Sequence, residues 1–302
     1  NVQLTCNGPY RIPNVKTEVL AVYTNNIPGG AFRGFGAPQG NFIAESQMNK
    51  LAEVLKIDPV ALRLRNLVRD GEPMPWGKPL PDTGRGMEES LVSAAHAIGW
   101  REIVNGWIAP QVRGHPEDAP YLRRGVGLAL AFKNVGFSFG YQENAWAGIE
   151  LHGGAAVEEA IVRVASAEVG QGVRTVARQM AAEALNIPID RVHLGDTDTA
   201  TTGSSGSVSA SRSTFMIGNA IRGAAAAVLQ RWDHEDRPAR AEYTYLAPQT
   251  TTMDSETGVG HPNFAYGYVA IAAEVAVDIR TGELRIPRIV CANDVGQAIN
   301  PR

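Results

Sequence analysis

The sequence predicts an α+β protein, because stretches with strand periodicity are interleaved with stretches of helical periodicity and few of them form clean βαβ units. Hydrophobic residues make up 44% of the chain and charged residues 20%, so the chain can fill large cores and is not a disordered protein. A length of 302 residues is typical of about two domains.

The first hundred residues predict one strand and several helices. Residues 15–24 alternate in polarity and contain β-branched and aromatic side chains, which predicts a strand. A glycine-rich run at 29–40 follows, and apolar residues at helical spacing predict a helix after it. Asp58 and Pro59 indicate a further helix start, with aspartate as the N-cap and proline in the first turn. A short helix is predicted at 88–98.

The second half begins with an apolar strand pattern after Gly127. Strand patterns at 145–152 and 160–168 precede a helix that the apolar spacing predicts at 173–186. A loop rich in serine and glycine, residues 201–213, leads into a second predicted helix. This half therefore alternates strands with helices.

The end of the chain predicts a β-hairpin. Residues 233–265 are polar and predicted to be irregular, and alternating apolar residues then flank a turn at Gly282, which supplies a positive φ. The irregular stretch at 108–122 is the predicted linker. It separates a first domain at 1–107 from a second domain at 123–302.

Charge and cysteine content exclude several classes of protein. Lysine and arginine number 28 and aspartate and glutamate 31, so the net charge of −3 gives no electrostatic footprint for nucleic acid or an anionic membrane. No apolar run approaches the roughly 18 residues of a membrane span. Cys6 and Cys291 lie far apart, which excludes a disulfide scaffold, a cysteine-rich zinc site and a self-contained iron–sulfur cluster.

The run GGAFRGFG at 29–36 is the strongest local motif, and two interpretations are open. It can be a tight turn with Phe32 and Phe35 in the core and Arg33 in a surface ion pair. It can also be a nest of backbone N–H groups for an anionic or oxo group, with an aromatic wall beside it. It is not a dinucleotide-binding fingerprint, because Gln39 occupies the place of the third glycine.

Two further loops lead into predicted helix starts. The first is VGQG at 169–172, and the second is the serine-rich segment at 204–214. A helix N-terminus carries about +0.5 charge and free N–H groups, and Arg212 could act as a charged clamp on phosphate oxygens. Ordinary N-capping explains either loop alone. Both loops together favour a large anionic ligand, such as a cofactor that carries a pyrophosphate.

Nine pieces of the sequence occur in an order that is specific for one family. They are GPYRIPNV (8–15), YTN (23–25), GAFRGFGAPQ (30–39), DPxxLRLRN (58–66), RRGVGLA (123–129), EVGQGxxT (168–175), SASRSTxxxGNA (209–220), EVAVDIRTGEL (274–284) and NDVGQAINP (293–301). With these pieces the chain resembles the molybdenum-cofactor-binding subunit of the xanthine dehydrogenase and aldehyde oxidase family. The resemblance runs almost end to end and is strongest to the branch that acts on purines, N-heterocycles and hydroxybenzoyl-CoA.

The resemblance implies two mixed α/β molybdopterin-binding domains, each incomplete in this chain. Residues 1–107 would be the C-terminal part of the first domain and 123–302 the N-terminal part of the second. The cofactor would be molybdenum with molybdopterin, which bacteria often extend to the cytosine dinucleotide. The residues implied to contact the cofactor are Gly30, Ala31, Phe32, Arg33, Gly34, Gly170, Gln171, Gly172, Thr175, Ser209, Ala210, Ser211 and Arg212. The pterin dithiolene, and no side chain of the protein, would hold the metal.

The resemblance also implies a reaction. The family hydroxylates an electron-poor carbon of a small molecule and passes the electrons to iron–sulfur and flavin centres, here expected as [2Fe–2S] and FAD on partner subunits of a cytoplasmic enzyme. Phe35 and Phe139 would face a flat aromatic or N-heterocyclic substrate, such as a purine or a nicotinate-like compound. The general-base glutamate is expected beyond Arg302, on another molybdenum-subunit fragment or in following sequence.

Three alternatives stay open at this point. The enzyme could be of the hydroxybenzoyl-CoA reductase type, or it could oxidise aldehydes. A protein of another class, a non-catalytic scaffold that keeps the fold without the metal, is the third alternative.

Overall fold

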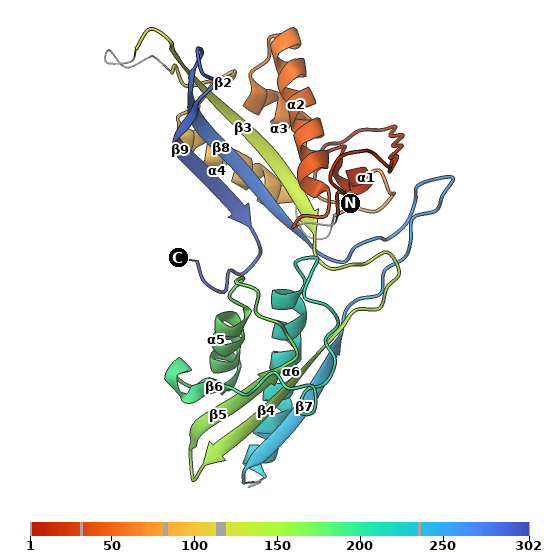
Figure 1. Ribbon diagram of the computed structural model, residues 1–302, viewed down its shortest axis with the longest axis vertical. Coiled ribbons are helices and arrows are strands. Elements are labelled where there is room, and N and C mark those ends of the chain that lie inside the picture. Colours follow the sequence, from red (N-terminus) through yellow and green to blue (C-terminus); the bar gives the residue numbers. More distant parts are fainter. Residues whose placement is uncertain (1, 31–32, 81–83, 113–118, 235–236, 302) are drawn as a thin grey trace. The chain divides into compact units, whose positions relative to one another are not determined.

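The computed structural model describes residues 2–30, 33–80, 84–112, 119–234 and 237–301 (Figure 1). The chain forms two compact units, each of which is described by itself. Unit 1 comprises residues 1–133, 253–260 and 265–296, and unit 2 comprises residues 134–252, 261–264 and 297–302. Both units combine helices with sheets, which confirms the predicted α+β class.

Unit 1 contains the helices that the first hundred residues predict. These are α1 (Val2–Thr5), α2 (Ala37–Leu55), α3 (Pro59–Asn66) and α4 (Gly84–Ile98). Asp58 caps α3 as predicted, because its Oδ1 accepts from Val60 N at 2.8 Å and from Ala61 N at 3.3 Å. The predicted helix start is therefore confirmed in its atomic detail.

A three-stranded sheet completes unit 1. The strands β3 (Leu122–Asn134), β8 (Tyr266–Asp278) and β9 (Leu284–Asp294) lie in the order β3-β8-β9, and α4 packs on β8 and β9. The antiparallel pairing of β8 with β9 confirms the predicted hairpin, and its turn has Gly282 at a φ of 76°. A separate small hairpin joins β1 (Arg101–Ile103) to β2 (Gly106–Ile108).

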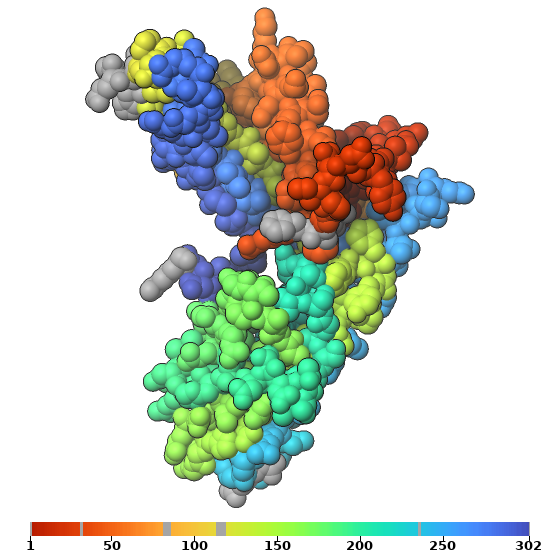
Figure 2. Space-filling model, in the orientation of Figure 1, coloured from red at the N-terminus to blue at the C-terminus, as the bar shows by residue number. Residues whose placement is uncertain are grey.

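The strand predicted at 15–24 is wrong for this structure. These residues have no regular structure, although their alternating pattern is that of a strand. Large apolar side chains in this stretch are exposed, among them Leu20, Val22 and Tyr23, and Figure 2 shows residues 11–30 as red atoms on the surface of unit 1. A strand requires a neighbour for its backbone hydrogen bonds, and in the described part of the chain this stretch has none.

The compact units do not follow the predicted division into residues 1–107 and 123–302. The reason is long-range strand pairing, because β8 lies between β3 and β9 and so joins the final hairpin to unit 1. Residues 113–118 of the predicted linker 108–122 lie outside the described residues. The two ranges stay a prediction about domains of the family.

Unit 2 has one four-stranded sheet in the order β6-β5-β4-β7. The strands are β4 (Asn144–Gly153), β5 (Val157–Val164), β6 (Val192–Leu194) and β7 (Ala239–Leu246), and a 3-10 turn, η1 (Ile189–Arg191), precedes β6. Strand β7 corrects the irregular structure predicted at 233–265. Its alternating sequence ARAEYTYL pairs with β4 along the whole of β7, so a sheet neighbour orders a segment that looks polar in isolation.

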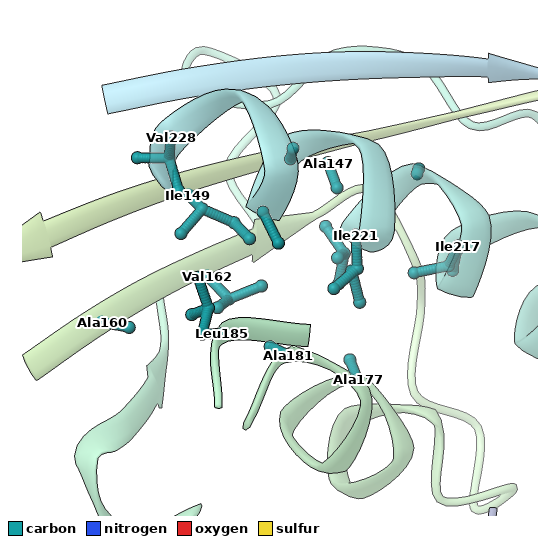
Figure 3. Close-up of a cluster of buried hydrophobic side chains, with 14 of the residues drawn as sticks. Ala147, Ile149, Ala160, Val162, Ala177, Ala181, Leu185, Ile217, Ile221 and Val228 are labelled. Atoms are coloured by element: carbon teal, nitrogen blue, oxygen red, sulfur yellow. The ribbon is translucent and has the colours of Figure 1, made fainter. Parts of the chain in front are cut away.

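Helices α5 (Val173–Leu185) and α6 (Ser213–Asp233) cover one face of this sheet and bury an apolar core (Figure 3). Along α5, Ala177, Ala181 and Leu185 follow one another in the same direction as Ile217, Ile221 and Val228 along α6. The two helices therefore begin at the same end of unit 2. In the described ranges, no helix is both long and apolar enough to cross a membrane.

Candidate functional site

Left-handed backbone conformations are concentrated in the loops that the sequence analysis singles out. Among the described residues, seven that are not glycine have positive φ, and two of these, Lys56 and Asn186, end helices, where the conformation is ordinary. The other five are Phe35, Ser138, Phe139, Ala210 and Ser211. Four of the five are predicted site residues. Such a conformation costs about 1–3 kcal/mol at each residue and persists where the surroundings enforce it, as they do at functional sites.

The first of these loops lies in unit 1, immediately before α2. Phe35 has a φ of 56° and stands between Gly34 and Gly36, which also have positive φ, and its side chain is 36% exposed. Arg33 is exposed, and both interpretations of the motif allow an exposed arginine. Gly30 is exposed as well, whereas Ala31 and Phe32 lie outside the described residues. Because Phe35 is exposed, the alternative in which this phenylalanine lies in the core is wrong.

The second loop joins β3 to β4 in unit 2 and contains Phe139, which is half-buried. Backbone N–H groups hold this loop at several points, since Phe139 N donates to Pro262 O at 2.9 Å and Gly140 N donates to Thr250 Oγ1 at 2.9 Å. Gly136 N donates to Ala210 O at 2.8 Å. The loop of Phe139 is therefore in direct contact with the serine-rich loop that precedes α6.

A buried ion pair connects the same two loops. The Glu143 side chain is fully buried and that of Arg212 is 4% exposed, and Nε of Arg212 lies 3.0 Å from Oε2 of Glu143. The other carboxylate oxygen of Glu143 accepts from the backbone N–H groups of Phe137 and Ser138. One oxygen of Glu143 thus accepts hydrogen bonds from the loop of Phe139, and the other accepts from the serine-rich loop.

Arg212 has a different role from the predicted clamp on phosphate oxygens. Its Nη1 donates to Ser205 O at 2.5 Å and to Ser207 O at 3.0 Å, and its Nη2 donates to Asn144 O at 2.6 Å. Together with the bond to Glu143, these contacts use most of the five guanidinium N–H groups inside the protein. The prediction that the Arg212 side chain binds an anion is corrected for this reason.

The magnitudes show why the strained loops are stable. Four left-handed residues in the two loops, Ser138, Phe139, Ala210 and Ser211, together cost several kcal/mol, at about 1–3 kcal/mol each. Each hydrogen bond to a charged group contributes about 1.5–3 kcal/mol, and Glu143 and Arg212 make six such bonds. Burial of the two charges also costs several kcal/mol of desolvation, so the pair holds the loops chiefly because their relaxation would leave a buried charge without its partner.

The loop before α5 is closed by its own carboxylate. Glu168 accepts from the backbone N–H groups of Gly170 at 2.9 Å, Gly172 at 3.0 Å and Arg174 at 3.2 Å. The bond from Gly172 is the largest of the causes that lower the pKa of this exposed carboxyl below its usual range. These N–H groups are occupied, so the prediction that this helix start receives the anion through them is corrected.

Gln171 and Thr175 are exposed on the same loop and helix start. Gln171 Oε1 accepts from Val169 N at 2.7 Å and its Nε2 donates to Ala167 O at 2.9 Å. The amide thus folds onto its own loop, and these two bonds use one of its two N–H groups. A Cβ atom added at Gly170 or Gly172 would meet no heavy atom within 4 Å, so these two residues border open space.

The serine-rich loop offers the donor groups that an anionic cofactor requires. Ser211 is exposed, and Ser209 and Ala210 are half-buried. Within the described residues, the backbone N–H groups of Ala210 and Ser211 have no hydrogen-bond partner. Because α5 and α6 begin at the same end of unit 2, the loop of Gln171 and this turn lie at that end together (Figures 1 and 3). The donors and the open space fit a bulky anionic group.

The family models described as molybdopterin cofactor-binding domains match most of the chain. One matches residues 1–67, and the other matches residues 104–239 and 232–302. The chain belongs to the molybdopterin cofactor-binding family. This confirms the resemblance to the molybdenum-binding subunits of the xanthine dehydrogenase and aldehyde oxidoreductase family.

Curated relatives and solved structures carry the same family names. An aldehyde oxidoreductase of Megalodesulfovibrio gigas is 30% identical over 96% of this chain and 32% of its own length, and a probable hypoxanthine oxidase of Escherichia coli is 29% identical over 100% and 34%. The chain therefore spans about a third of the length of these relatives. The solved aldehyde oxidoreductase of Desulfovibrio gigas superposes with a TM-score of 0.70 at 28% identity, over 91% of this chain and 30% of its own.

Quinoline 2-oxidoreductase of Pseudomonas putida 86 has the same fold. Its TM-score is 0.70 at 19% identity, over 92% of this chain and 39% of its own. The described residues of this molybdopterin-binding chain contain no group of three or more histidine, cysteine, aspartate or glutamate side chains placed to hold a metal ion.

Glu143 is the site residue that the sequence analysis missed. A single glutamate in the segment GYQENAW carries no motif, and its partner Arg212 is 69 residues away. The only available signal was indirect, because a charged residue directly before an apolar strand has to be solvated or paired. In this molybdopterin-binding chain it is paired.

Proposed function

We propose that this chain is the molybdopterin-binding part of an oxidoreductase that hydroxylates a flat aromatic or N-heterocyclic compound. The observation that carries the proposal is the concentration of left-handed residues in the loops of Phe35, Phe139 and Ala210–Ser211. Evolution retains such strain where a ligand requires the shape. The match to the molybdopterin-binding family names the ligand class.

The cofactor would be held mainly by backbone donors of this chain. The N–H groups of Ala210 and Ser211 suit the oxygen atoms of a phosphate or pterin, and the remaining N–H of Gln171 can donate from the neighbouring loop. An added Cβ at Gly170 or Gly172 would meet no heavy atom within 4 Å, so these glycines leave room for part of a bound cofactor, for which we propose the cytosine dinucleotide form. When bound, the cofactor supplies the redox chemistry, in which an oxygen from water is added to the substrate carbon.

The substrate would be recognised by two aromatic side chains. Phe35 is partly exposed and Phe139 is half-buried, and each has a positive φ, which sets the direction in which its side chain leaves the backbone. An aromatic pair contributes about 0.5–1.5 kcal/mol beyond burial, which suits flat rings better than small aldehydes. The alternative of an aldehyde substrate is favoured by the name of the Megalodesulfovibrio gigas relative.

The complete enzyme requires more than this chain provides. Among the described residues around the Phe139 and Ser211 loops, the buried carboxylate Glu143 is occupied by Arg212 and two N–H groups and is not a free base. In line with the resemblance, we propose that the general base lies outside this chain. Partner subunits with [2Fe–2S] and FAD would take the electrons.

The proposal is tested on the enzyme purified with its partner subunits. Molybdenum is measured by elemental analysis, and pterin and cytidine monophosphate are measured after acid release. Turnover is then assayed with hypoxanthine, nicotinate, benzaldehyde and the small aldehyde acetaldehyde. Molybdenum with pterin, and a kcat/KM that is highest for a heterocycle, are expected. Absence of both metal and pterin would overturn the proposal, and turnover of acetaldehyde as well as benzaldehyde, with neither heterocycle turned over, would establish the aldehyde alternative.

A further inference from the structure

The carboxylate of Glu143 is fully buried, and its hydrogen bonds go to the loops of Phe139 and Ser211, which the proposed function assigns to the substrate and the cofactor. We propose that Glu143 is a positioning residue, which holds Phe139 and the Ala210–Ser211 turn in their left-handed conformations and thereby sets the affinity for flat substrates. The inference rests on the proposed function, because that function gives Phe139 its contact with the substrate.

The geometry allows Glu143 to act on both loops at once. Its Oε1 accepts from Phe137 N and Ser138 N, immediately before Phe139, and its Oε2 accepts from Arg212 Nε at 3.0 Å, immediately after Ser211. Each strained pair of residues is thus adjacent in sequence to a group that Glu143 binds. The bond from Gly136 N to Ala210 O also joins the loop of Phe139 to the Ala210–Ser211 turn.

The chemistry of the site requires a carboxylate. Both oxygens of Glu143 face donors, with two N–H groups on one side and a guanidinium on the other. A glutamine has the same shape but only one acceptor oxygen. In the variant Glu143→Gln, an NH₂ group must therefore face either Arg212 or the two backbone donors, and one side of the clamp is lost. This makes Glu143→Gln a nearly isosteric test.

The strand that follows Glu143 provides a matched control. Glu150 lies on β4, its side chain is 9% exposed, and it pairs with Arg240 at 2.9 Å and with Arg163 at 3.4 Å. It alternates with Ile149 and Leu151, which belong to the core under α5 and α6, so it lies on the other face of the sheet. Glu150→Gln removes a buried carboxylate from arginine partners without touching either loop.

The experiment compares the wild-type holoenzyme with the variants Glu143→Gln, Glu143→Asp and Glu150→Gln. Peptide hydrogen exchange is followed over residues 135–143 and 204–213, together with molybdenum content, pterin content, kcat and KM. Glu143→Gln is expected to exchange about tenfold faster in both loops and to raise KM about tenfold for hypoxanthine, nicotinate or benzaldehyde, whichever the wild type turns over, with a smaller change in kcat. Glu143→Asp keeps the charge and is expected to fall between Glu143→Gln and the wild type.

The outcomes separate this inference from the proposed function. Exchange and KM of Glu143→Gln that equal those of Glu150→Gln would overturn the positioning role. If Glu143→Gln does not fold, the same comparison applies to Glu143→Asp. A wild-type enzyme without molybdenum and pterin would overturn the proposed function and with it the effect on substrate, while the exchange rates would still decide whether Glu143 holds the loops.

Discussion

The loops that precede α5 and α6 begin helices at the same end of unit 2, but they are held in different ways. The buried ion pair of Glu143 with Arg212 holds the loop before α6. The loop before α5 is closed on itself by the exposed carboxylate of Glu168, which accepts from Gly170, Gly172 and Arg174. Left-handed residues other than glycine occur in the loop before α6 and not in the loop before α5.

The difference shows which surroundings can maintain a strained backbone conformation for a ligand. Strained residues require surroundings that oppose relaxation, and a buried ion pair with backbone partners supplies them. The loop before α5 contains glycines at its turns and needs only local hydrogen bonds. The conformation of the loop before α6 therefore depends on a partner that is distant in sequence, whereas that of the loop before α5 depends on a carboxylate of the loop itself.

The largest effect is expected when the buried pair is broken. Arg212→Met leaves the carboxylate of Glu143 buried without its partner, which should lower the free energy of unfolding by about 3–5 kcal/mol. The measurement is urea unfolding of the enzyme, followed by hydrogen exchange of the peptide 204–213. The control Arg240→Met removes an arginine that is 67% exposed and should change the stability by less than about 1 kcal/mol. Equal effects of the two substitutions would contradict the difference between the loops.

A smaller effect is expected at the aromatic ring of unit 1. Phe35→Ala removes a ring that the proposed function places against the substrate, so kcat/KM for flat aromatic compounds should fall by about 10- to 100-fold. The control Phe42→Ala removes a phenyl ring of α2 that is 74% exposed, and kcat/KM should stay at the wild-type value. If Phe35→Ala also leaves kcat/KM unchanged, Phe35 has no contact with the substrate.

The next effect is expected at Gly136 and concerns the free energy of unfolding. This residue has a φ of 87°, and an added Cβ would lie 2.6 Å from Glu143 Oε1. Gly136→Ala should therefore lower the free energy of unfolding by about 1–3 kcal/mol, because both the backbone and the carboxylate must move. Gly154→Ala is the control, since nothing lies within 4 Å of its added Cβ. Equal unfolding midpoints for the two variants would show that the carboxylate is free to shift.

The smallest effect concerns the loop before α5 and depends on pH. The folded pKa of Glu168 is lowered, chiefly by the bond from Gly172, so its contribution to stability is complete above the usual pKa of 4.5 and disappears as the pH falls through the lower folded value. Wild type should unfold at a higher temperature than Glu168→Gln at pH 7, and the gap should close at acidic pH. The exposed Glu183 of α5 provides the control Glu183→Gln. A gap that does not change with pH would contradict the capping role.

The sequence predicts the elements whose signals are local. The cap at Asp58, the helices at α5 and α6 and the turn at Gly282 follow from neighbouring residues, and the structure confirms them. It does not predict interactions between distant residues, such as the ion pair of Glu143 with Arg212 or the pairing of β8 with β3.

Strand formation is the clearest case of this limit. Residues 15–24 have the pattern of a strand without a neighbour, and residues 239–246 form a strand because β4 lies beside them. The sequence predicts the wrong role for Arg212 for a related reason, because its burial depends on Glu143 and Asn144, which are distant in sequence.

Hydrogen exchange of the enzyme with and without its cofactor tests the central claim most directly. If the loops of this chain hold molybdopterin, removal of the cofactor should increase exchange in the peptides that cover residues 135–143, 168–172 and 204–213. Strand β7, on the edge of the same sheet, should exchange at the same rate in both forms. Unchanged exchange in all three loops, with protection by the cofactor confined to other parts of the enzyme, would contradict the account.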